Sequence, residues 1–415
     1  MIRKIFYKFY NLINKGEIER FYREIRFRNE TMQPYNKNEF SEYLKFWGFK
    51  EDLAENPLMG KEEVIRWCEQ CDAYKKAHSF TYTGGSMGNP LKFPYSRRRA
   101  YFKTASIKFY LGLINYSVGD AYLMVRAKQR NRLIQRLRNE TIILPTNLSK
   151  GRLMQIIKII QRKRIMYYIG YPSYLTELGV YVLENKINLK CFKGIICISE
   201  PLHPYQYEII SKAFNCIILS RYSNEEVGVI AHQRTPEGDY IVDRGGVVVE
   251  VLDPLTLEPV KEGMEGKVVV TDLNSDLVPM VRYDTGDNAI VSQYKDGQLY
   301  SLKKVTGREA EKIYTTKGVP VSPLSLGPGI YKPFSDKHYN LSFQFVQMGG
   351  KDYELRIKSN EEKIDNQVVN EILNNIRSIL GVDATVNICF NKSFKQRKSG
   401  KMPIYFNETN ESVLM

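Results

Sequence analysis

The stretch GIICISEPLHPYQYEIISKAFNCIILS, residues 194–220, contains the pattern from which the architecture is predicted. One apolar run opens it at 194–199 and a second closes it at 216–220, and both have the length of buried strands. Between them, residues 204–214 carry apolar side chains at the spacing of a helix that buries one face. A strand, a helix and a strand in this order indicate two parallel strands joined by a crossover helix.

The same alternation extends back to residue 79 and predicts a mostly parallel α/β sheet. Residues 1–78 before it are expected to be helical. The additional elements expected between residues 79 and 220 are strands at 79–83, 121–125, 141–144 and 167–172 and helices at 96–116, 150–163 and 172–185.

After residue 228 the pattern changes to short strands joined by Gly, Asp and Pro turns, which predicts an antiparallel, barrel-like part. Residues 308–415 predict a small α+β unit with a hairpin, a helix and a further strand. A chain of 415 residues is too long for one compact core. We therefore expect a large domain at residues 1–307 and a small C-terminal domain at 308–415.

The formal net charge of +15 suits partners that carry phosphates or form an anionic surface. No module typical of nucleic-acid binding is recognised, so nucleic acid is not expected as a partner. No run of about 20 apolar residues predicts a membrane span. The basic and aromatic residues 1–10 are expected either to dock on the domain body or to rest on an anionic membrane at its inner face.

Six cysteines in a chain of this length indicate no disulfide framework and a reduced, cytoplasmic protein. Cys68 and Cys71 have the spacing of zinc ligands, but a second pair of ligands at matching spacing is missing. The segment also predicts a helix, on which positions three apart share a face. We therefore favour an ordinary helix over a zinc site there.

Residues 83–90, TGGSMGNP, are expected to form a loop between a strand and a helix. A loop rich in glycine and hydroxyl residues can direct backbone N–H groups at phosphate oxygens. The segment has neither the lysine of a GxxxxGK[ST] loop nor the spacing of GxGxxG. By itself, such a segment is more often an ordinary turn than a phosphate site.

Residues 222–228, YSNEEVG, follow a buried strand. Carboxylates at the carboxyl end of a parallel strand lie where open α/β sheets bind ligands. Carboxylate oxygens suit Mg²⁺, which commonly bridges one or two of them to a substrate phosphate. The alternative is a surface loop, and this segment alone does not decide between the two.

Three further segments carry polar chemistry. Residues 282–287, RYDTGD, place two aspartates beside a glycine turn, where they can accept hydrogen bonds from ribose hydroxyls. Residues 306–308, TGR, offer an arginine near the expected domain boundary, and residues 398–401, KSGK, form a basic loop near the C-terminus. Each segment is a weak signal, but their order and spacing together are informative.

In that order the segments resemble the adenylate-forming superfamily of acyl-CoA synthetases and adenylation domains. Within it the chain is most similar to the phenylacetate–CoA ligase family, including its branch in capsular polysaccharide biosynthesis. The resemblance covers nearly the whole chain. The eight matching segments lie at residues 56–61, 83–90, 171–175, 199–201, 222–226, 282–287, 307–308 and 399–401.

The resemblance implies a two-step reaction. A carboxylate attacks the α-phosphate of ATP, which gives an acyl-adenylate and pyrophosphate, and a nucleophilic acceptor then takes the acyl group. The implied substrates are ATP with Mg²⁺, a small carboxylic acid, and either an amino sugar or saccharide intermediate or CoA. The implied small C-terminal domain rotates between the two half-reactions.

The resemblance also assigns roles to individual residues. In the catalytic set, Glu226 binds Mg²⁺, Arg308 lies near the ribose at the hinge, and Lys401 approaches the α-phosphate and the acyl oxygen. The nucleotide-binding residues are Thr83, Gly84, Gly85, Ser86 and Gly88 at the phosphates, Glu200 and Pro201 against the adenine, Tyr222, and Asp287 at the ribose hydroxyls.

The chain departs from the family pattern in several places. Met87 stands where a hydroxyl residue is usual, and Ser223 and Glu225 replace a glycine and a hydroxyl residue before Glu226. Ala310 replaces the aspartate that follows the Gly-Arg pair. These changes motivate the alternative hypothesis of a catalytically degenerate, nucleotide-binding scaffold of a polysaccharide-assembly complex.

Overall fold

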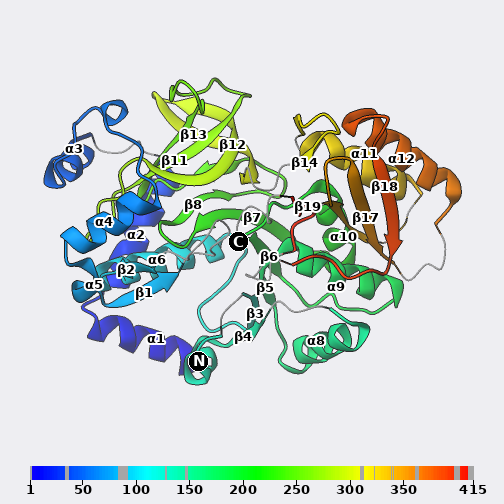
Figure 1. Cartoon of the computed structure of the whole chain (residues 1–415). Coiled ribbons are helices and arrows are strands. Elements are labelled where there is room, and N and C mark those ends of the chain that lie inside the picture. Colours follow the sequence, from blue (N-terminus) through cyan, green and yellow to red (C-terminus); the bar gives the residue numbers. More distant parts are fainter. Residues whose placement is uncertain are drawn as a thin grey trace.

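The computed structural model describes residues 2–32, 37–82, 92–126, 129–144, 148–308, 313–321, 323–337, 339, 341–359, 364–396 and 402–409. One 11-stranded sheet runs through the larger part of the molecule, in the order β10-β11-β12-β13-β9-β8-β7-β6-β5-β3-β4 (Figure 1). A separate four-stranded sheet forms the smaller part. Within the described residues no helix is long and apolar enough to cross a membrane.

Five parallel strands form one half of the large sheet, as the alternating pattern predicts. Helix α6 (Arg97–Gly112) contributes to the apolar clusters on one face, while α8 (Lys150–Arg162), α9 (Pro172–Glu184) and α10 (Pro204–Phe214) cover the other. The strands are β3 (Tyr122–Val125), β4 (Glu140–Ile143), β5 (Tyr167–Gly170), β6 (Gly194–Ile198) and β7 (Ile217–Asn224).

The antiparallel half is also confirmed, and it continues the same sheet. Strand β7 pairs in parallel with β6 on one side and antiparallel with β8 on the other, because a short turn at residues 225–227 reverses the chain. The antiparallel strands are β8 (Gly228–Gln233), β9 (Tyr240–Val242), β10 (Val247–Leu252), β11 (Glu265–Asp272), β12 (Tyr283–Lys295) and β13 (Gln298–Arg308).

The first part of the chain is helical, as expected. Helix α2 packs on α6 through Phe21 and Ile25, and α4 contributes Val64 and Cys68 to the core beneath the antiparallel strands. Cys68 is therefore a buried apolar residue of a helix. The helices are α1 (Ile2–Ile13), α2 (Glu17–Thr31), α3 (Lys37–Phe46), η1 (Leu53–Glu55), α4 (Lys61–Gln70) and α5 (Ala73–Lys76).

The expected strand–loop–helix arrangement around residues 83–90 is wrong. Strand β1 (Ser79–Tyr82) pairs antiparallel with β2 (Lys92–Tyr95), so the glycine-rich segment joins two strands of a hairpin. Helix α6 starts only after β2, where the Ser96 side chain accepts a hydrogen bond from the Arg99 N–H. Residues 83–91 themselves lie outside the described residues.

The smaller part has the strand order β18-β17-β16-β19, and α11 and α12 pack together beside it (Figure 1). Val180, Tyr205 and Ile209 of α9 and α10 belong to the apolar cluster of this part, so the two parts share buried surface. Its elements are β14 (Ile313–Tyr314), β15 (Pro320–Val321), α11 (Pro323–Asp336), β16 (Ser342–Gln347), β17 (Asp352–Lys358), α12 (Asn366–Leu380), β18 (Thr385–Phe390) and β19 (Tyr405–Asn407).

Candidate active site

Tyr222, near the carboxyl end of β7, joins the parallel half of the sheet to β12. Its hydroxyl lies 2.9 Å from Asp287 Oδ2 and 3.2 Å from Thr285 Oγ1. Thr285 also accepts a hydrogen bond from the Asp287 N–H and donates one to the carbonyl of Val268. Two of the predicted nucleotide-binding residues, Tyr222 and Asp287, are therefore in direct contact. Thr285, which belongs to the same segment 282–287 but was assigned no role, bonds to both.

Glu226 occupies the turn between β7 and β8. Its side chain is buried, at 5% exposure, and Oε1 accepts a hydrogen bond from the Tyr283 hydroxyl at 2.8 Å. A carboxylate can accept several hydrogen bonds through its two oxygens. The described residues hold no cluster of three or more metal-ligating side chains. A magnesium ion that is bound mainly through phosphates needs only one or two carboxylates, so Glu226 fits that role.

The stems of the β1–β2 hairpin meet the same turn. Thr81 Oγ1 donates to Glu225 Oε2 at 2.5 Å, and the Tyr95 hydroxyl bonds to the Glu225 carbonyl. Because Thr81 lies two residues before the segment 83–90, these bonds anchor one end of the hairpin loop beside Glu225 and Glu226. The stems of the hairpin therefore lie beside the turn that carries Glu225 and Glu226.

Lys103 of α6 reaches this turn from the other side. Its ammonium lies 3.2 Å from the Tyr95 hydroxyl and 3.6 Å from the Glu225 carboxylate. Burial raises the pKa of the Glu225 carboxyl, but Lys103 and the Thr81 hydroxyl outweigh it, so the pKa lies below the ordinary value. The sequence gave no signal for Lys103, because a single lysine in a helix is normally a solvated residue.

Glu200 follows β6 and connects three segments. Its Oε2 accepts a hydrogen bond from the Ser173 N–H at 3.2 Å, at the start of α9. Its Oε1 accepts one from the Met402 N–H at 3.0 Å. Ser199 before it adopts a left-handed conformation, with φ of 68°, which turns the chain sharply past Pro201. Glu200 thus holds the residue next to Lys401 at the carboxyl edge of the sheet.

Aromatic and basic side chains from three segments surround the turn that carries Glu200. The His203 ring lies 5.8 Å from the Tyr405 ring of β19. Burial, with a smaller contribution from Lys304 of β13, lowers the pKa of His203 to about 3, so its ring is neutral at physiological pH. Burial also lowers the pKa of Lys304. A lysine that is partly stripped of water beside the turn raises the local affinity for anions.

Two members of the RYDTGD segment hold the scaffold together and do not face the site. Arg282 is 4% exposed, pairs with Glu250 at 3.2 Å, and donates to the carbonyls of Ala54 and Asn56. Asp284, the other aspartate expected near a ribose, instead pairs with Lys267 at 2.9 Å. Only the last aspartate of the segment lies beside Tyr222.

Several predicted site residues lie outside what the structure describes. They are Thr83, Gly84, Gly85, Ser86, Gly88 and Lys401. Arg308 is described only in its backbone, as the last residue of β13 in register with Asp287. Met87 and Ala310, the two substitutions behind the scaffold hypothesis, also lie outside the described residues.

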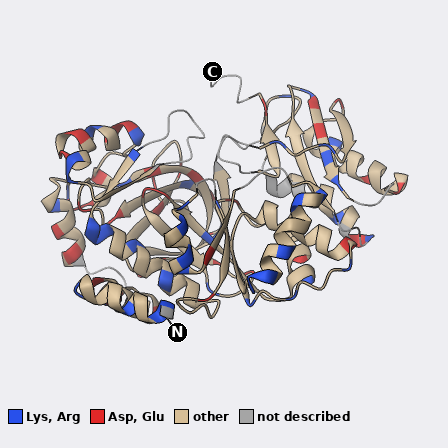
Figure 2. Cartoon of the chain, turned by 90° about the horizontal axis from the view of Figure 1, so that it is seen from below, with Lys and Arg blue, Asp and Glu red and all other residues tan. Residues whose placement is uncertain are grey.

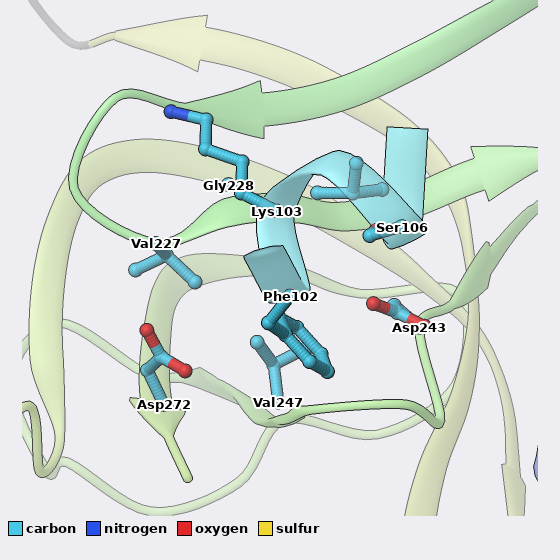
Figure 3. A pocket seen from close by; sticks show the side chains of 9 residues that line it. Phe102, Lys103, Ser106, Val227, Gly228, Asp243, Val247 and Asp272 are labelled. Carbon is cyan, nitrogen blue, oxygen red and sulfur yellow. The ribbon is translucent and has the colours of Figure 1, made fainter. Parts of the chain in front are cut away.

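An enclosed cavity lies between α6 and β8, next to the turn that carries Glu226. It is lined by Phe102, Ser106, Val229, Asp243 and Asp272, among others, and Lys103 extends from it toward the β7–β8 turn (Figure 3). Its volume is about 10 Å³, enough for about one water molecule. The cavity is therefore an internal packing defect and too small for a substrate.

Comparisons with known proteins find similar sequences and similar structures. No family model matches the chain. Phenylacetate-coenzyme A ligases of Pseudomonas putida and Aromatoleum evansii are similar to it, at 23% identity over 145 residues and 26% identity over 152 residues. These alignments cover 34% of this chain and 33% of each relative. The chain thus matches about a third of the length of these curated relatives.

Solved ligases share the fold over most of the chain. A 2-hydroxyisobutyryl-CoA ligase in a postadenylation state, in complex with R3-HIB-AMP, has a TM-score of 0.68 at 15% identity, with 96% of this chain and 90% of that chain covered. MatB from Rhodopseudomonas palustris, bound to ATP, has a TM-score of 0.52 at 16% identity over 81% of this chain and 68% of its own. The chain therefore has the fold of the adenylate-forming ligases.

Proposed function

We propose that this protein is an ATP-dependent adenylate-forming ligase. One observation carries the proposal: Glu200 holds the Met402 backbone at the sheet edge where Tyr222 contacts Asp287. This contact brings the segment next to Lys401 to the residues that the family resemblance assigns to ATP. Segments from four regions of the chain thus meet at one edge, which is where open α/β sheets bind ligands.

In this proposal the residues position charges and transfer no proton. The segment 83–90 and Lys401 neutralise the phosphates, Asp287 holds the ribose hydroxyls, and Glu226 binds the magnesium ion. When bound, Mg²⁺ neutralises charge that develops on the leaving pyrophosphate. Removing one such preorganised contact raises the barrier by about 2.7–4 kcal/mol, or about 10²–10³ in rate. Arg308 is proposed to act near the ribose.

The acceptor is proposed from chemistry and from relatives. The phenylacetate-coenzyme A ligases carry CoA in their names, and a related 2-hydroxyisobutyryl-CoA ligase was solved with 2-HIB-AMP and CoA. CoA is thus one candidate acceptor. An amino sugar or saccharide intermediate of a surface polysaccharide is the other, and the basic charge of the chain suits either phosphate-bearing molecule. We place the reaction in the cytoplasm, at the inner face of the membrane.

Pyrophosphate exchange tests the first half-reaction directly. The purified protein is incubated with ATP, Mg²⁺, labelled pyrophosphate and a panel of carboxylic acids. We expect acid-dependent exchange into ATP, reduced at least a hundredfold in Lys401→Ala and in Glu226→Gln, with unfolding transitions unchanged. If ATP binds by calorimetry but no acid in a broad panel supports exchange, the ligase proposal fails.

The scaffold hypothesis predicts a different result for the same variants. A scaffold keeps its cellular role when Lys401 becomes alanine, because binding needs no charge at the α-phosphate. Restoring the usual hydroxyl with Met87→Thr then changes nothing measurable in exchange. A ligase loses its cellular role with Lys401→Ala, so complementation of a deletion strain distinguishes the two hypotheses.

A further inference from the structure

A buried arginine and a buried histidine lie side by side on the α6 face of the sheet. Arg221 of β7 is in register with His232 of β8, and directly opposite residues of neighbouring strands point to the same face. The next residue, Tyr222, points to the opposite face, where it contacts Thr285 and Asp287. Arg221 therefore lies behind the proposed nucleotide site, on the other side of β7.

Three of the side-chain nitrogens of this pair lack hydrogen-bond partners among the described residues. Arg221 Nε and Nη1 and His232 Nε2 are buried and have no hydrogen-bond partner among the described residues. The His232 ring stacks on Tyr110 at 4.8 Å, so an aromatic wall borders the pair. A guanidinium whose nitrogens are buried without hydrogen-bond partners is destabilising, and an anionic group beside it would offset that cost.

Protonation states define which ligand fits. Burial lowers the pKa of Arg221 to about 10, and Tyr110 and Glu225 offset it only in part, so the guanidinium stays charged at neutral pH. Burial lowers the pKa of His232 to about 3, so its ring is neutral. The acidic side chain that acts on the Arg221 guanidinium is Glu225, in the turn that follows β7, and Thr81 and Lys103 already engage it. A fixed cation beside a neutral ring selects an anion.

We infer that Arg221 binds a second anionic group of the carboxylic acid that the enzyme activates. Arg221 lies three residues before Asn224, the end of β7, which is about 10 Å along a strand. An acid whose reacting carboxylate lies at that edge can extend its tail toward Arg221. The forked guanidinium suits a carboxylate or a phosphate. The inference rests on the proposed function and names its substrate class.

Matched pairs of acids test it by pyrophosphate exchange. Glutarate is compared with valerate, and 3-phosphoglycerate with glycerate, so that the two pairs distinguish a carboxylate tail from a phosphate tail. We expect the anionic member of one pair to be favoured at least tenfold in kcat/KM. Arg221→Gln should abolish that preference, whereas Lys158→Leu, which removes an exposed lysine on α8, should leave it intact.

The outcomes distinguish a failure of the Arg221 inference from a failure of the proposed ligase function. If uncharged acids support exchange as well as anionic ones and Arg221→Gln changes only the melting temperature, Arg221 is a structural residue and the inference fails while the ligase stands. If no acid supports exchange although ATP binds, both fail. Arg221→Lys keeps the positive charge but loses the forked guanidinium. It replaces Arg221→Gln as the test variant if Arg221→Gln does not fold.

A second, independent observation concerns the outer surface at helices α1 and α7 (Arg132–Arg138). The two helices touch, and Arg3 Nε donates to the Arg136 carbonyl at 3.2 Å. The inner face of α1 docks on the domain body, where Tyr7 packs beside α2 and α6 and lies under Lys108. The first of the two expectations for the N-terminal segment is thus confirmed, and none of the described residues covers its outer face.

That outer face is apolar and basic. Leu12 of α1 is 74% exposed, Phe9 is 59% exposed, and Leu133 of α7 is 69% exposed. Neither helix contains an acidic residue. In Figure 2 the helix beside the N-terminal label carries blue basic segments between uncharged ones. We call this surface the α1–α7 platform; its exposed apolar residues are Ile5, Phe6, Phe9, Tyr10, Leu12, Ile13, Leu133, Ile134 and Leu137, and its basic ones Arg3, Lys4, Lys8, Arg132, Arg136 and Arg138.

We propose that the α1–α7 platform binds the surface of an anionic bilayer. Basic residues interleaved with aromatic and aliphatic ones are the composition of helices that lie in a membrane interface. Each basic residue near an anionic leaflet contributes about 1 kcal/mol, and apolar burial adds to it. A second copy of the chain would present the same positive charges and be repelled, so charge complementarity favours lipid.

Vesicle sedimentation tests the platform. The full chain is mixed with vesicles of phosphatidylcholine alone or with 30% phosphatidylglycerol. We expect binding to the anionic vesicles only, reduced at least fivefold in 0.5 M NaCl and lost in Phe9→Glu/Leu12→Glu. Phe46→Glu on α3, which is 75% exposed in the native protein, is the matched control and should bind normally.

Two results overturn the proposal. One is equal sedimentation with both kinds of vesicle, or with neither. The other is a dimer in light scattering that Phe9→Glu/Leu12→Glu dissociates, because the platform would then be covered by a second copy. The variant is expected to keep wild-type pyrophosphate exchange, since the platform and the sheet edge are built from different residues.

Discussion

The Tyr222 hydroxyl has a role separate from that of its aromatic ring. It touches both Asp287 and Thr285, so it fixes the carboxylate that is proposed to hold the ribose. The ring and the hydroxyl therefore make separable contributions. The ring contributes apolar surface to the proposed nucleotide site, and the hydroxyl orients the Asp287 carboxylate.

Tyr222→Phe tests that separation. Removing the hydroxyl deprives Asp287 of a hydrogen bond worth about 1.5 kcal/mol, so we expect the KM for ATP to rise about tenfold with little change in kcat. The measurement is steady-state pyrophosphate exchange at varied ATP. Tyr240→Phe, which loses a bond to Ser220 at 2.7 Å elsewhere in the sheet, should leave this KM unchanged. An equal effect of both variants would point to a general loss of stability.

His232 is one of two histidines, with His203, whose lowered pKa makes stability depend on pH. Its pKa is lowered to about 3 by burial, against an ordinary value near 6.5, so the unfolded state binds one more proton between these values. The free energy of unfolding is therefore complete above about pH 6.5 and falls as the pH drops through this window, by up to about 1.4 kcal/mol per pH unit. Urea unfolding between pH 5 and 7 measures the slope.

Two variants identify the source of that slope. His232→Gln should reduce the slope of the free energy of unfolding against pH by the contribution of one proton, because the side chain no longer titrates. His78→Gln, at an exposed position, should retain the wild-type slope. If both variants keep the wild-type slope, His232 is not the group responsible.

At the scale of elements, Arg282 fastens the segment before α4 to strand β12. Its guanidinium bonds to the Ala54 and Asn56 carbonyls and pairs with Glu250, and backbone bonds join Met59 to both sides of Tyr283. Arg282 lies in a segment that resembles a nucleotide-binding motif, but in this structure it is buried and stabilises the packing of two segments. Asp287, the last residue of the same segment, instead contacts the Tyr222 hydroxyl.

Arg282→Met should cost far more than the loss of an exposed pair. It leaves Glu250 buried without its cation, so we expect a loss of about 3–5 kcal/mol in the free energy of unfolding. Lys267→Met breaks the half-exposed pair with Asp284 and should cost about 0–1 kcal/mol. Chemical denaturation measures both. Similar losses for the two variants would contradict the role of burial.

The elements that periodicity could predict are those with a buried face. Strands β5, β6 and β7 and helices α9 and α10 all bury apolar residues, and each was predicted within a few residues. Helix α7 was missed because it buries no residue and so carries no apolar period. Strand β19 has only three residues and was missed as well. Short elements with no buried stripe give no sequence signal.

The site was predicted by motif and completed by geometry. Tyr222, Glu226, Asp287 and Glu200 were chosen by resemblance, and the structure brings Tyr222 to Asp287 and Glu200 to Met402. Lys103 could not be predicted, because its role depends on contacts between segments distant in sequence. Thr285 lies in the segment 282–287 that the motif marked, but no role was assigned to it. The hairpin form of residues 79–95 was missed because a glycine-rich turn is compatible with either a helix or a strand after it.

At the scale of the whole molecule, the small part is placed so that Glu200 of the large part binds the backbone of Met402, next to Lys401. In this chain the small part is held against α9 and α10 by Tyr205 and Phe343, whose rings lie 4.7 Å apart, and by Glu177 and Lys358 at 2.9 Å. A rotation of the small part has to break these contacts.

The Glu177–Lys358 pair is therefore expected to set the balance between the two half-reactions. Glu177 is nearly buried, and burial raises the pKa of its carboxyl even though Lys358 opposes the change. Lys358→Met leaves that carboxylate unpaired, which should weaken the observed arrangement and slow pyrophosphate exchange relative to acyl transfer. Glu177→Gln added to it should restore part of the loss, with a coupling of about 1–3 kcal/mol.

The control for this cycle is a pair within the small part alone. Lys351 and Asp383 are 2.7 Å apart and largely exposed, so Lys351→Met should cost about 0–1 kcal/mol and leave the ratio of the half-reactions unchanged. Exchange and acyl transfer are measured separately for each variant. If Lys358→Met slows both half-reactions equally, the pair stabilises the fold without selecting an arrangement. If it slows exchange alone, the adenylating arrangement depends on this contact, because the pair bridges the two parts and Lys351 does not.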